Sequence, residues 1–214
     1  MRLVLASNNA KKLAELRALL VGLPLDIVAQ GELGIKEADE PFHSFVENAL
    51  AKARHAARAS GCAAIADDSG LCVAALGGAP GVDSAHFAGE LPPLDGEPRE
   101  QRRRRQDAAN NATLLARLAD RNEPTDRRAH FISTLVAIRH ADDPEPLVAV
   151  GRWPGQVLLA PRGDQGFGYD PLMHIAELGA TVAQLDAGRK NAHSHRARSA
   201  AQMRALLAEV WWPG

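Results

Sequence analysis

A strongly periodic helix that runs directly into a short apolar strand constrains the fold of this chain more than any other feature. Ser44 is placed to cap the helix, apolar side chains follow the 3.6-residue period from Val46 to Ala57, and Gly61 stands where a C-terminal cap belongs. The strand over residues 63–66 is apolar throughout, as strands covered on both faces are. This succession predicts an α/β protein.

Other segments continue the alternation of strands and helices. Strands are predicted over residues 3–6, 25–28, 71–76, 130–140 and 146–150, and again over 157–159 after Trp153-Pro154-Gly155 breaks the chain's last hairpin. Helices are predicted from residue 12, around residues 114–118, briefly over 182–185, and from residue 194 onward. Residues 89–106 are rich in proline and charge, which predicts an exposed excursion. Short parallel-type strands together with a hairpin predict a mixed sheet flanked by helices.

Composition excludes several classes of protein. The 214 residues carry 25 Lys+Arg against 26 Asp+Glu, without the basic excess of a dedicated DNA-binding domain. With 46% hydrophobic and 24% charged residues, the chain is not disordered. No apolar run reaches the roughly 18 residues of a membrane span or the about 7–15 of a signal-peptide core. Cys62 and Cys72 form no C-x-x-C pair. We expect one cytoplasmic domain over residues 1–214 that binds neither nucleic acid nor membrane.

Two lysines stand at the start of the first predicted helix, where the helix dipole disfavours cations. The preceding turn offers backbone N–H groups, the Ser7 hydroxyl and the Asn9 amide beside Lys11 and Lys12. Such a turn suits a phosphate group, although the Walker A pattern is absent. The alternative is a Ser or Asn helix cap followed by solvated lysines.

A pair of acids, Asp67 and Asp68, directly follows the buried strand over residues 63–66. Grouped carboxylates suit a hard cation such as magnesium, and a plain Asp-Asp-Ser-Gly turn is the alternative. The helix that carries Glu47 leads into this strand, so Glu47 is a second candidate ligand. Ser44-x-x-Glu47 also fits a capping box, in which the carboxylate serves only the helix end.

Aromatic and basic residues gather in two later segments. Phe167 and the only tyrosine, Tyr169, stand in a glycine-rich loop although aromatic residues make up just 4% of the chain. Phe167 is suited to stack on a base, or both rings pin the loop to the body. The cluster of Lys190 with residues 193–196 favours an anion, or its histidines flank a Ser194 cap. The run Arg102–Arg105 is a solvated face or a weak nucleic-acid patch.

Six motifs, in this order, resemble the inosine/xanthosine triphosphate pyrophosphatase family from residue 3 to about residue 207. They are Ser7-Asn8-Asn9-Ala10-Lys11-Lys12, Phe45-Val46-Glu47-Asn48-Ala49, Ala66-Asp67-Asp68-Ser69-Gly70, Trp153-Pro154-Gly155, Phe167-Gly168-Tyr169-Asp170-Pro171 and Ser194-His195-Arg196. The resemblance implies an elongated α/β fold with a central mixed sheet, two lobes with an active-site cleft between them, and a homodimer. It implies magnesium-dependent hydrolysis of non-standard purine nucleoside triphosphates (ITP, dITP, XTP) to a monophosphate and pyrophosphate.

The resemblance also implies a role for each matching residue. The phosphates would be held by Ser7, Asn8, Asn9, Ala10, Lys11 and Lys12. Asp68 would activate water and bind magnesium together with Glu47, and Ser69 would touch the substrate. The base pocket would be formed by Phe167, Gly168, Tyr169 and Asp170 with Trp153 nearby. Base and phosphate recognition would be completed by Lys190, His195 and Arg196.

The sequence departs from the family pattern at one position, and two other functions are alternatives to the one that the family implies. Asn8 stands where the family often has glycine, and asparagine tolerates the left-handed conformation better than most residues. The Maf-like nucleotide pyrophosphatases also begin with a strand ending in Leu-Ala-Ser, but they usually carry arginine where Lys12 stands. Outside enzymes, the alternative is a nucleotide- or RNA-binding protein that uses Arg102–Arg105.

Overall fold

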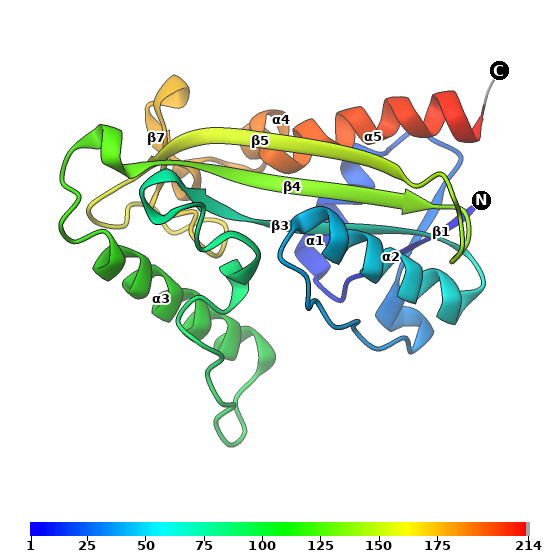
Figure 1. The fold of residues 1–214 in the computed structure, drawn as a ribbon, viewed down its shortest axis with the longest axis horizontal. Helices are drawn as coiled ribbons and strands as arrows, with labels where there is room; N and C mark the ends of the chain where they lie inside the picture. Colours follow the sequence, from blue (N-terminus) through cyan, green and yellow to red (C-terminus); the bar gives the residue numbers. More distant parts are fainter. Residues whose placement is uncertain (213–214) are drawn as a thin grey trace. The chain divides into compact units, whose positions relative to one another are not determined.

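A mixed β-sheet forms the scaffold of the protein. The computed structural model describes residues 1–212, of which Lys11 is described by its backbone alone. Within this range a seven-stranded sheet has the order β2-β1-β3-β4-β5-β6-β7 (Figure 1). Its strands are β1 (Arg2–Leu5), β2 (Asp26–Ala29), β3 (Ala63–Val73), β4 (Arg128–Ile138), β5 (Leu147–Val157), β6 (Met173–Ile175) and β7 (Ala180–Thr181). Because β1 is parallel to β2 and β3 whereas β6 is antiparallel to β5 and β7, the predicted mixed sheet is confirmed.

Helices lie between strands along the chain and after the last of them. They are α1 (Ala10–Leu19), α2 (Phe45–Ser60), α3 (Arg99–Arg117), α4 (Ala187–His193) and α5 (His195–Trp211). The Ser44 hydroxyl accepts the Glu47 N–H at the start of α2, and Gly61 ends the helix in the left-handed conformation, at φ 67°. Ser194 caps α5 in the same way. Among the described helices, none is long and apolar enough to cross a membrane.

The chain forms two compact units, in agreement with the two lobes that the resemblance implies. The first comprises Met1–Ser69, Ser133–Arg152 and the C-terminal segment from His193, and the second comprises Gly70–Ile132 and Trp153–Ala192. The strands β3, β4 and β5 contribute residues to both units. The active-site cleft and the single catalytic domain stay predictions.

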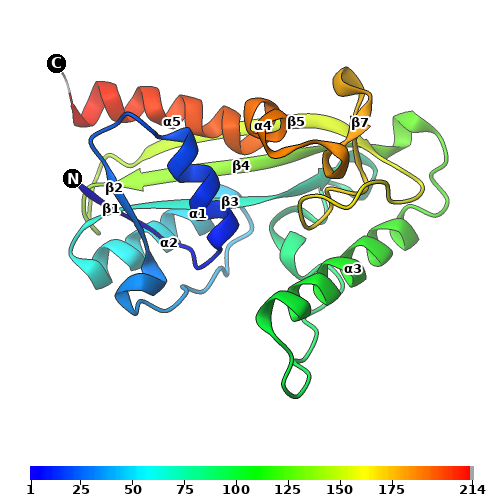
Figure 2. The same ribbon diagram turned by 180° about the vertical axis from the view of Figure 1, so that it is seen from behind.

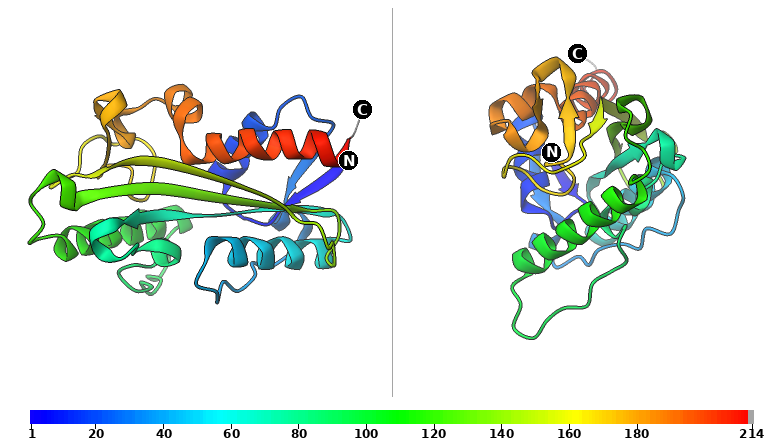
Figure 3. Two further views of the ribbon diagram at one scale, coloured as in Figure 1. Left: turned by 45° about the horizontal axis from the view of Figure 1, so that its top comes forward. Right: turned by 90° about the vertical axis from the view of Figure 1, so that its left-hand side faces the viewer.

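The first unit has helices on both faces of its sheet (Figure 3). Leu3 and Leu5 of β1 point to one face, where they pack with α1 and with Met203 of α5. Val4 and Ala6 point to the opposite face, where the alanines of α2 cover them. This division follows from the two-residue period of a strand, and every strand in the middle of the unit obeys it. Consecutive residues of β3 therefore face different helices.

The second unit is built around one hydrophobic cluster. Leu114 of α3 and Leu118, which directly follows the helix, pack against Phe131, Trp153 and Leu172. Each of these side chains is at least 94% buried. The cluster holds α3 and the segment after β5 in one compact body.

The sequence pattern predicts that the acidic segment ends a strand, and the structure shows that it does not. β3 continues from Ala63 to Val73, so Asp67 and Asp68 lie in its middle and the predicted Asp-Asp-Ser-Gly turn is wrong. Both carboxylates are paired with cations, as described below, and their charge is therefore compatible with a buried strand.

Two other boundaries differ from the prediction. α3 begins at Arg99, so the arginine run is helical rather than part of an exposed excursion; arginine, glutamine and glutamate are good helix formers even where no apolar period marks them. β5 passes through Trp153-Pro154-Gly155 without a break. Its partner β6 pairs only with Gln156 and Val157, and a strand tolerates proline where no neighbour needs its N–H.

Candidate active site

The middle of β3 divides two adjacent acids between the two faces of the first unit. Ile65 belongs to the cluster that includes α1 and α5, and Ala66 belongs to the cluster covered by α2. By the same alternation Asp67 meets residues of α1 and α5, whereas Asp68 meets a residue of α2. The two carboxylates consequently have different partners and different chemistry.

Asp67 is saturated by hydrogen bonds and ion pairs. Its Oδ1 accepts the Ser133 hydroxyl at 2.8 Å. Its Oδ2 lies 3.0 and 3.1 Å from two guanidinium nitrogens of Arg196 and 3.1 Å from Lys12 Nζ, and it accepts the Ser69 hydroxyl at 3.3 Å. Burial opposes ionisation, but the charges of Lys12 and Arg196 outweigh it and hold the pKa of Asp67 far below its usual range. Asp67 is thus a fixed anion that orients two cations.

The contacts of Ser7 and Asn9 confirm in part the alternative that these residues cap the first helix. The side-chain oxygen of Asn9 accepts the Lys12 N–H at 3.3 Å, and Ser7 Oγ accepts the Asn9 N–H at 3.2 Å. Lys12 is not solvated as that alternative required, because its ammonium group pairs with Asp67. Asn8 does not adopt the left-handed conformation, since positive φ angles among the described residues are confined to glycines.

The remaining residues of the turn are placed as follows. Ala10 is the first residue of α1. The predicted phosphate contact of Lys11 lies outside the described side chains. Asn8 has a buried Oδ1 with no hydrogen-bond partner among the described residues. The phosphate-binding role of the whole turn stays a prediction.

Asp68 shares a buried lysine with a second carboxylate. Lys52 Nζ of α2 lies 2.8 Å from Asp68 Oδ1 and 2.9 Å from Glu40 Oε2, and it also donates to the carbonyl oxygen of Asp67 at 3.3 Å. The other oxygen, Asp68 Oδ2, is buried and receives no hydrogen bond from the described residues. One oxygen of Asp68 is thereby fixed, and the other is available to a substrate, a water molecule or a cation.

The environment of Asp68 shifts its pKa in the direction opposite to that of Asp67. Burial raises the pKa of Asp68 to about 6, the charge of Lys52 opposes this rise, and the neighbouring Glu40 carboxyl adds to it. Lys52 itself stays protonated, because the charges of Asp68 and Glu40 outweigh the effect of burial and raise its pKa. A carboxylate with a pKa near 6 is ionised at neutral pH and still basic enough to accept a proton.

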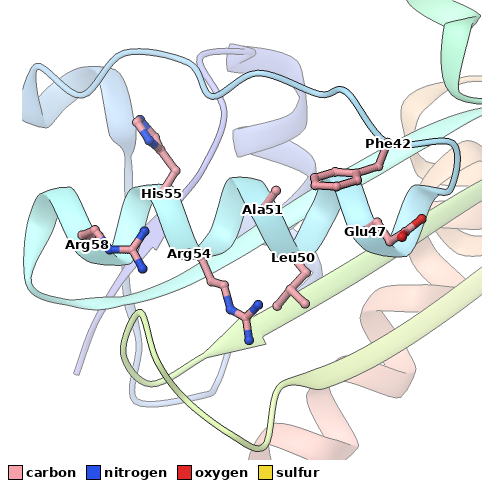
Figure 4. A pocket seen from close by; sticks show the side chains of 7 residues that line it. All are labelled: Phe42, Glu47, Leu50, Ala51, Arg54, His55 and Arg58. Carbon is pink, nitrogen blue, oxygen red and sulfur yellow. The ribbon is translucent and has the colours of Figure 1, made fainter.

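Glu47 contacts the side chain of the helix cap, and not the backbone N–H that the capping-box alternative requires. Its Oε2 accepts the Ser44 hydroxyl at 2.5 Å, and the carboxylate is exposed. It lines a shallow hollow of about 420 Å³ along α2 (Figure 4), together with Phe42, Leu50, Ala51, Arg54, His55 and Arg58. The structure brings Glu40 to Asp68, and the predicted metal-ligand role of Glu47 gains no contact to support it.

The glycine-rich loop of the second unit surrounds an aspartate–lysine pair. Asp170 Oδ2 lies 2.8 Å from Lys190 Nζ and accepts the Phe167 N–H at 2.9 Å. The Lys190 ammonium group also stands 4.5 Å from the centre of the Phe167 ring, within cation–π distance. The predicted base-pocket residues Phe167, Asp170 and Lys190 are therefore brought together.

Two aromatic residues of the predicted base pocket serve the body of the second unit instead. The Tyr169 hydroxyl donates to the carbonyl oxygen of Ser84 at 3.0 Å, so this ring pins the loop, as one alternative proposed. Trp153 is 1% exposed in the hydrophobic cluster, and a ring so covered presents no face to a ligand. This burial does not favour the predicted place of Trp153 in the base pocket, which stays a prediction.

The last motif lies in the first unit. His195 and Arg196 are the first two residues of α5, and both are buried rather than exposed around the Ser194 cap. Arg196 joins Asp67 to Glu15, and its Nη2 donates to Ser69 Oγ at 3.2 Å. Arg196 thus has carboxylate partners within the unit.

Sequence reasoning missed four residues of the site: Glu15, Glu40, Lys52 and Ser133. Lys52 left a detectable signal, because it falls on the alanine face of α2 between Ala49 and Ala53, where an unpaired charge is costly. Glu40 stands in a polar segment with no periodic pattern, so nothing in its surroundings marks it.

The arginine run of α3 is engaged by acids and an aromatic ring. Arg102 pairs with Glu90 at 2.8 Å, Arg104 with Glu100 at 3.5 Å, and Arg105 with Glu97 at 2.9 Å. Arg103 lies over the Phe167 ring. These charges are compensated within the chain and the Arg104 side chain is 80% exposed, which favours a solvated face over a nucleic-acid patch.

Comparison with known proteins identifies the chain. Residues 3–206 match the Ham1 family. Two proteins named dITP/XTP pyrophosphatase, from Methylibium petroleiphilum and Leptothrix cholodnii, are each 64% identical over 212 residues, with 99% of both chains covered. The structure of a HAM1 protein from Coxiella burnetii is 38% identical, with a TM-score of 0.86 over 98% of this chain and 100% of that one. With this family match and this fold, the chain belongs to the Ham1 family.

Proposed function

We propose that the chain hydrolyses non-standard purine nucleoside triphosphates (ITP, dITP and XTP) between the α- and β-phosphates. The products are a nucleoside monophosphate and pyrophosphate, so the enzyme would cleanse the nucleotide pool. The hydrogen bonding of Asp68 gives this proposal its main support. Its Oδ1 is fixed by Lys52, and its buried Oδ2 has no donor among the described residues. The names of the relatives support the substrate class.

Asp68 is the general base of this proposal. Lys52 holds the carboxylate in one orientation, and Oδ2 takes the proton of the water that attacks phosphorus. The new P–O bond forms as the bond to the bridging oxygen breaks, and pyrophosphate leaves. A pKa near 6 keeps Asp68 ionised at neutral pH for this purpose.

Glu40 and Asp68 fit a magnesium ion. Both are hard oxygen donors, and their carboxylates lie close enough to share one lysine. Magnesium is commonly bound by one or two carboxylates and substrate phosphates, in keeping with the absence of any larger His/Cys/Asp/Glu group among the described residues. When bound, the metal would neutralise phosphate charge. We propose Glu40 with Asp68 as its protein ligands; Glu47, the ligand expected from the family motif, is the competing assignment.

Phosphate and base recognition extend the proposal. The turn of residues 7–12 would hold phosphates through backbone N–H groups and Lys12, which Asp67 keeps in place. His195, Arg196 and Ser69 would contribute to substrate binding. Phe167 would stack on the base, and Lys190, fixed by Asp170, would donate to the 6-oxo group that hypoxanthine and xanthine carry where adenine has an amine. A site that requires this acceptor can reject adenine by about 10⁴-fold.

A substrate panel tests the function. Pyrophosphate release from ITP, dITP and XTP should greatly exceed release from ATP, GTP, UTP and TTP in the presence of magnesium. Orthophosphate as the direct product, or UTP turnover equal to that of ITP, would contradict the proposal. The second outcome would favour the chemistry of the Maf-like enzymes.

The setting of the enzyme is also proposed. We infer a cytoplasmic homodimer acting as one catalytic domain over residues 1–214, without nucleic-acid or membrane partners. Cys62 is a free thiol, which suits a reducing compartment. Sedimentation at twice the chain mass of 22.8 kDa would support the dimer, and sedimentation at the chain mass itself would contradict it.

A further inference from the structure

One ridge of α3 contacts the loop that carries Phe167. Arg103, Asp107 and Asn111 are spaced four residues apart, so their side chains lie on one face of the helix. The loop after β5 lies beside α3 in two opposite views (Figures 1 and 2). Both elements belong to the second unit.

The three side chains of the ridge act on two consecutive residues of the loop. Asp107 Oδ2 accepts the Gly168 N–H at 2.9 Å, and Asn111 Nδ2 donates to the Gly168 carbonyl oxygen at 2.9 Å. The Arg103 guanidinium carbon stands 4.8 Å from the centre of the Phe167 ring. The ridge therefore binds both backbone polar groups of Gly168 and the ring of the residue before it.

The backbone around Phe167 requires such support. Gly166 and Gly168 flank the ring at φ 78° and 61°, in the left-handed region that glycine adopts readily. A Gly-Phe-Gly segment has large conformational freedom, and fixing its ring upon ligand binding would cost entropy. Hydrogen bonds from a rigid helix remove that freedom before the ligand arrives.

Other polar residues of α3 have different partners. Asn110 donates to the Ala85 carbonyl oxygen at 2.9 Å, and Gln106 donates to the Gly89 carbonyl oxygen at 2.8 Å. Arg104 pairs with Glu100 on the exposed surface. The contacts to Phe167 and Gly168 are thus a property of one ridge and not of the whole helix.

We infer that Arg103, Asp107 and Asn111 are positioning residues that preorganise Phe167 for stacking on the purine base. The inference rests on the proposed function, because it takes Phe167 as the stacking ring. The ridge acts through Gly168 and the ring and does not itself react. Its loss weakens base binding and leaves the chemistry at Asp68 intact.

Two substitutions at one position test this inference. In Asp107→Ala the Gly168 N–H loses its acceptor, so we expect faster hydrogen exchange over residues 166–170. We expect KM for ITP to rise about tenfold, with kcat near the wild-type value. Asp107→Asn keeps an acceptor oxygen and should restore both quantities. Arg104→Ala, on the same helix but off the ridge, should match the wild type, and Asn111→Ala should repeat the effect of Asp107→Ala.

Each contrary result has a definite meaning. Wild-type KM and exchange in Asp107→Ala and Asn111→Ala would overturn the inference, as would a loss of kcat equal to the rise in KM. If Asp107→Asn failed to rescue, the acceptor contact would be irrelevant and the inference wrong. A wild-type protein that neither bound nor hydrolysed ITP would overturn the proposed function itself, and the inference with it.

Discussion

Replacing Asp67 with asparagine should lower the stability of the folded protein, although the side chain keeps its shape. Asp67 is the shared counter-ion of Arg196 and Lys12, at 3.0–3.1 Å from each, and all three groups are largely buried. Among the described residues, a neutral amide leaves Lys12 with only its contact to the Asp67 carbonyl oxygen and Arg196 with Glu15 and Ser69. The buried cations are then under-compensated.

The size of this effect follows from the type of contact. Removing one partner of a buried ion pair costs about 3–5 kcal/mol. For a chain of this length each kcal/mol lowers the melting temperature by roughly 2–4 °C, so Asp67→Asn should melt about 6–20 °C below the wild type.

Asp68→Asn is the matched control. Folding raises the pKa of Asp68 to about 6, so the folded state binds the proton more tightly than the unfolded chain does, and ionised Asp68 opposes folding at neutral pH. Lys52 keeps Glu40 as a partner in this variant. Its melting temperature should therefore fall much less than that of Asp67→Asn. Circular dichroism during thermal and urea unfolding measures both variants. Equal losses in the two, or a wild-type midpoint for Asp67→Asn, would refute the division of roles between the two acids.

Two further predictions concern the metal and the core. Glu40→Gln should raise the magnesium concentration needed for half-maximal hydrolysis, whereas Glu47→Gln should leave it unchanged because that carboxylate is bound to Ser44; a magnesium titration decides, and the reverse order would assign the metal to Glu47. Trp153→Ala should lower the free energy of unfolding by about 3–5 kcal/mol because its ring is fully buried. A changed KM for ITP at unchanged stability would instead place Trp153 in the base pocket.

Patterns within short stretches of the sequence are enough to predict helix α2, the Asp170 loop and the start of helix α5. The cap at Ser44, the period of α2 and the glycine at its end are all encoded within twenty residues, and the structure confirms them. The Asp170 loop and the start of α5 were likewise marked by glycines and by Ser194. The acid pair and the basic cluster marked Asp68 and Lys190 as candidate site residues, the family motifs gave them predicted roles, and the structure gives each of them a buried partner.

The remaining features depend on contacts between distant residues. β3 runs through its two acids because Asp67 meets Arg196, 129 positions away in the chain, and no local rule foresees that pair. Lys52 is 16 residues from Asp68, beyond the reach of any helical or strand period. The start of α3 was missed for another reason: its first turns carry charge on all sides and pack little apolar surface, so no period indicated a helix.

In the proposed mechanism, Asp68 accepts the proton of the attacking water. The most direct test compares pyrophosphate release from ITP by the wild type and by Asp68→Asn, with ITP binding measured on both. Loss of a general base typically lowers kcat by about 10²–10⁴-fold, and we predict a loss of this size with ITP binding retained. Turnover of Asp68→Asn at the wild-type rate would contradict the account.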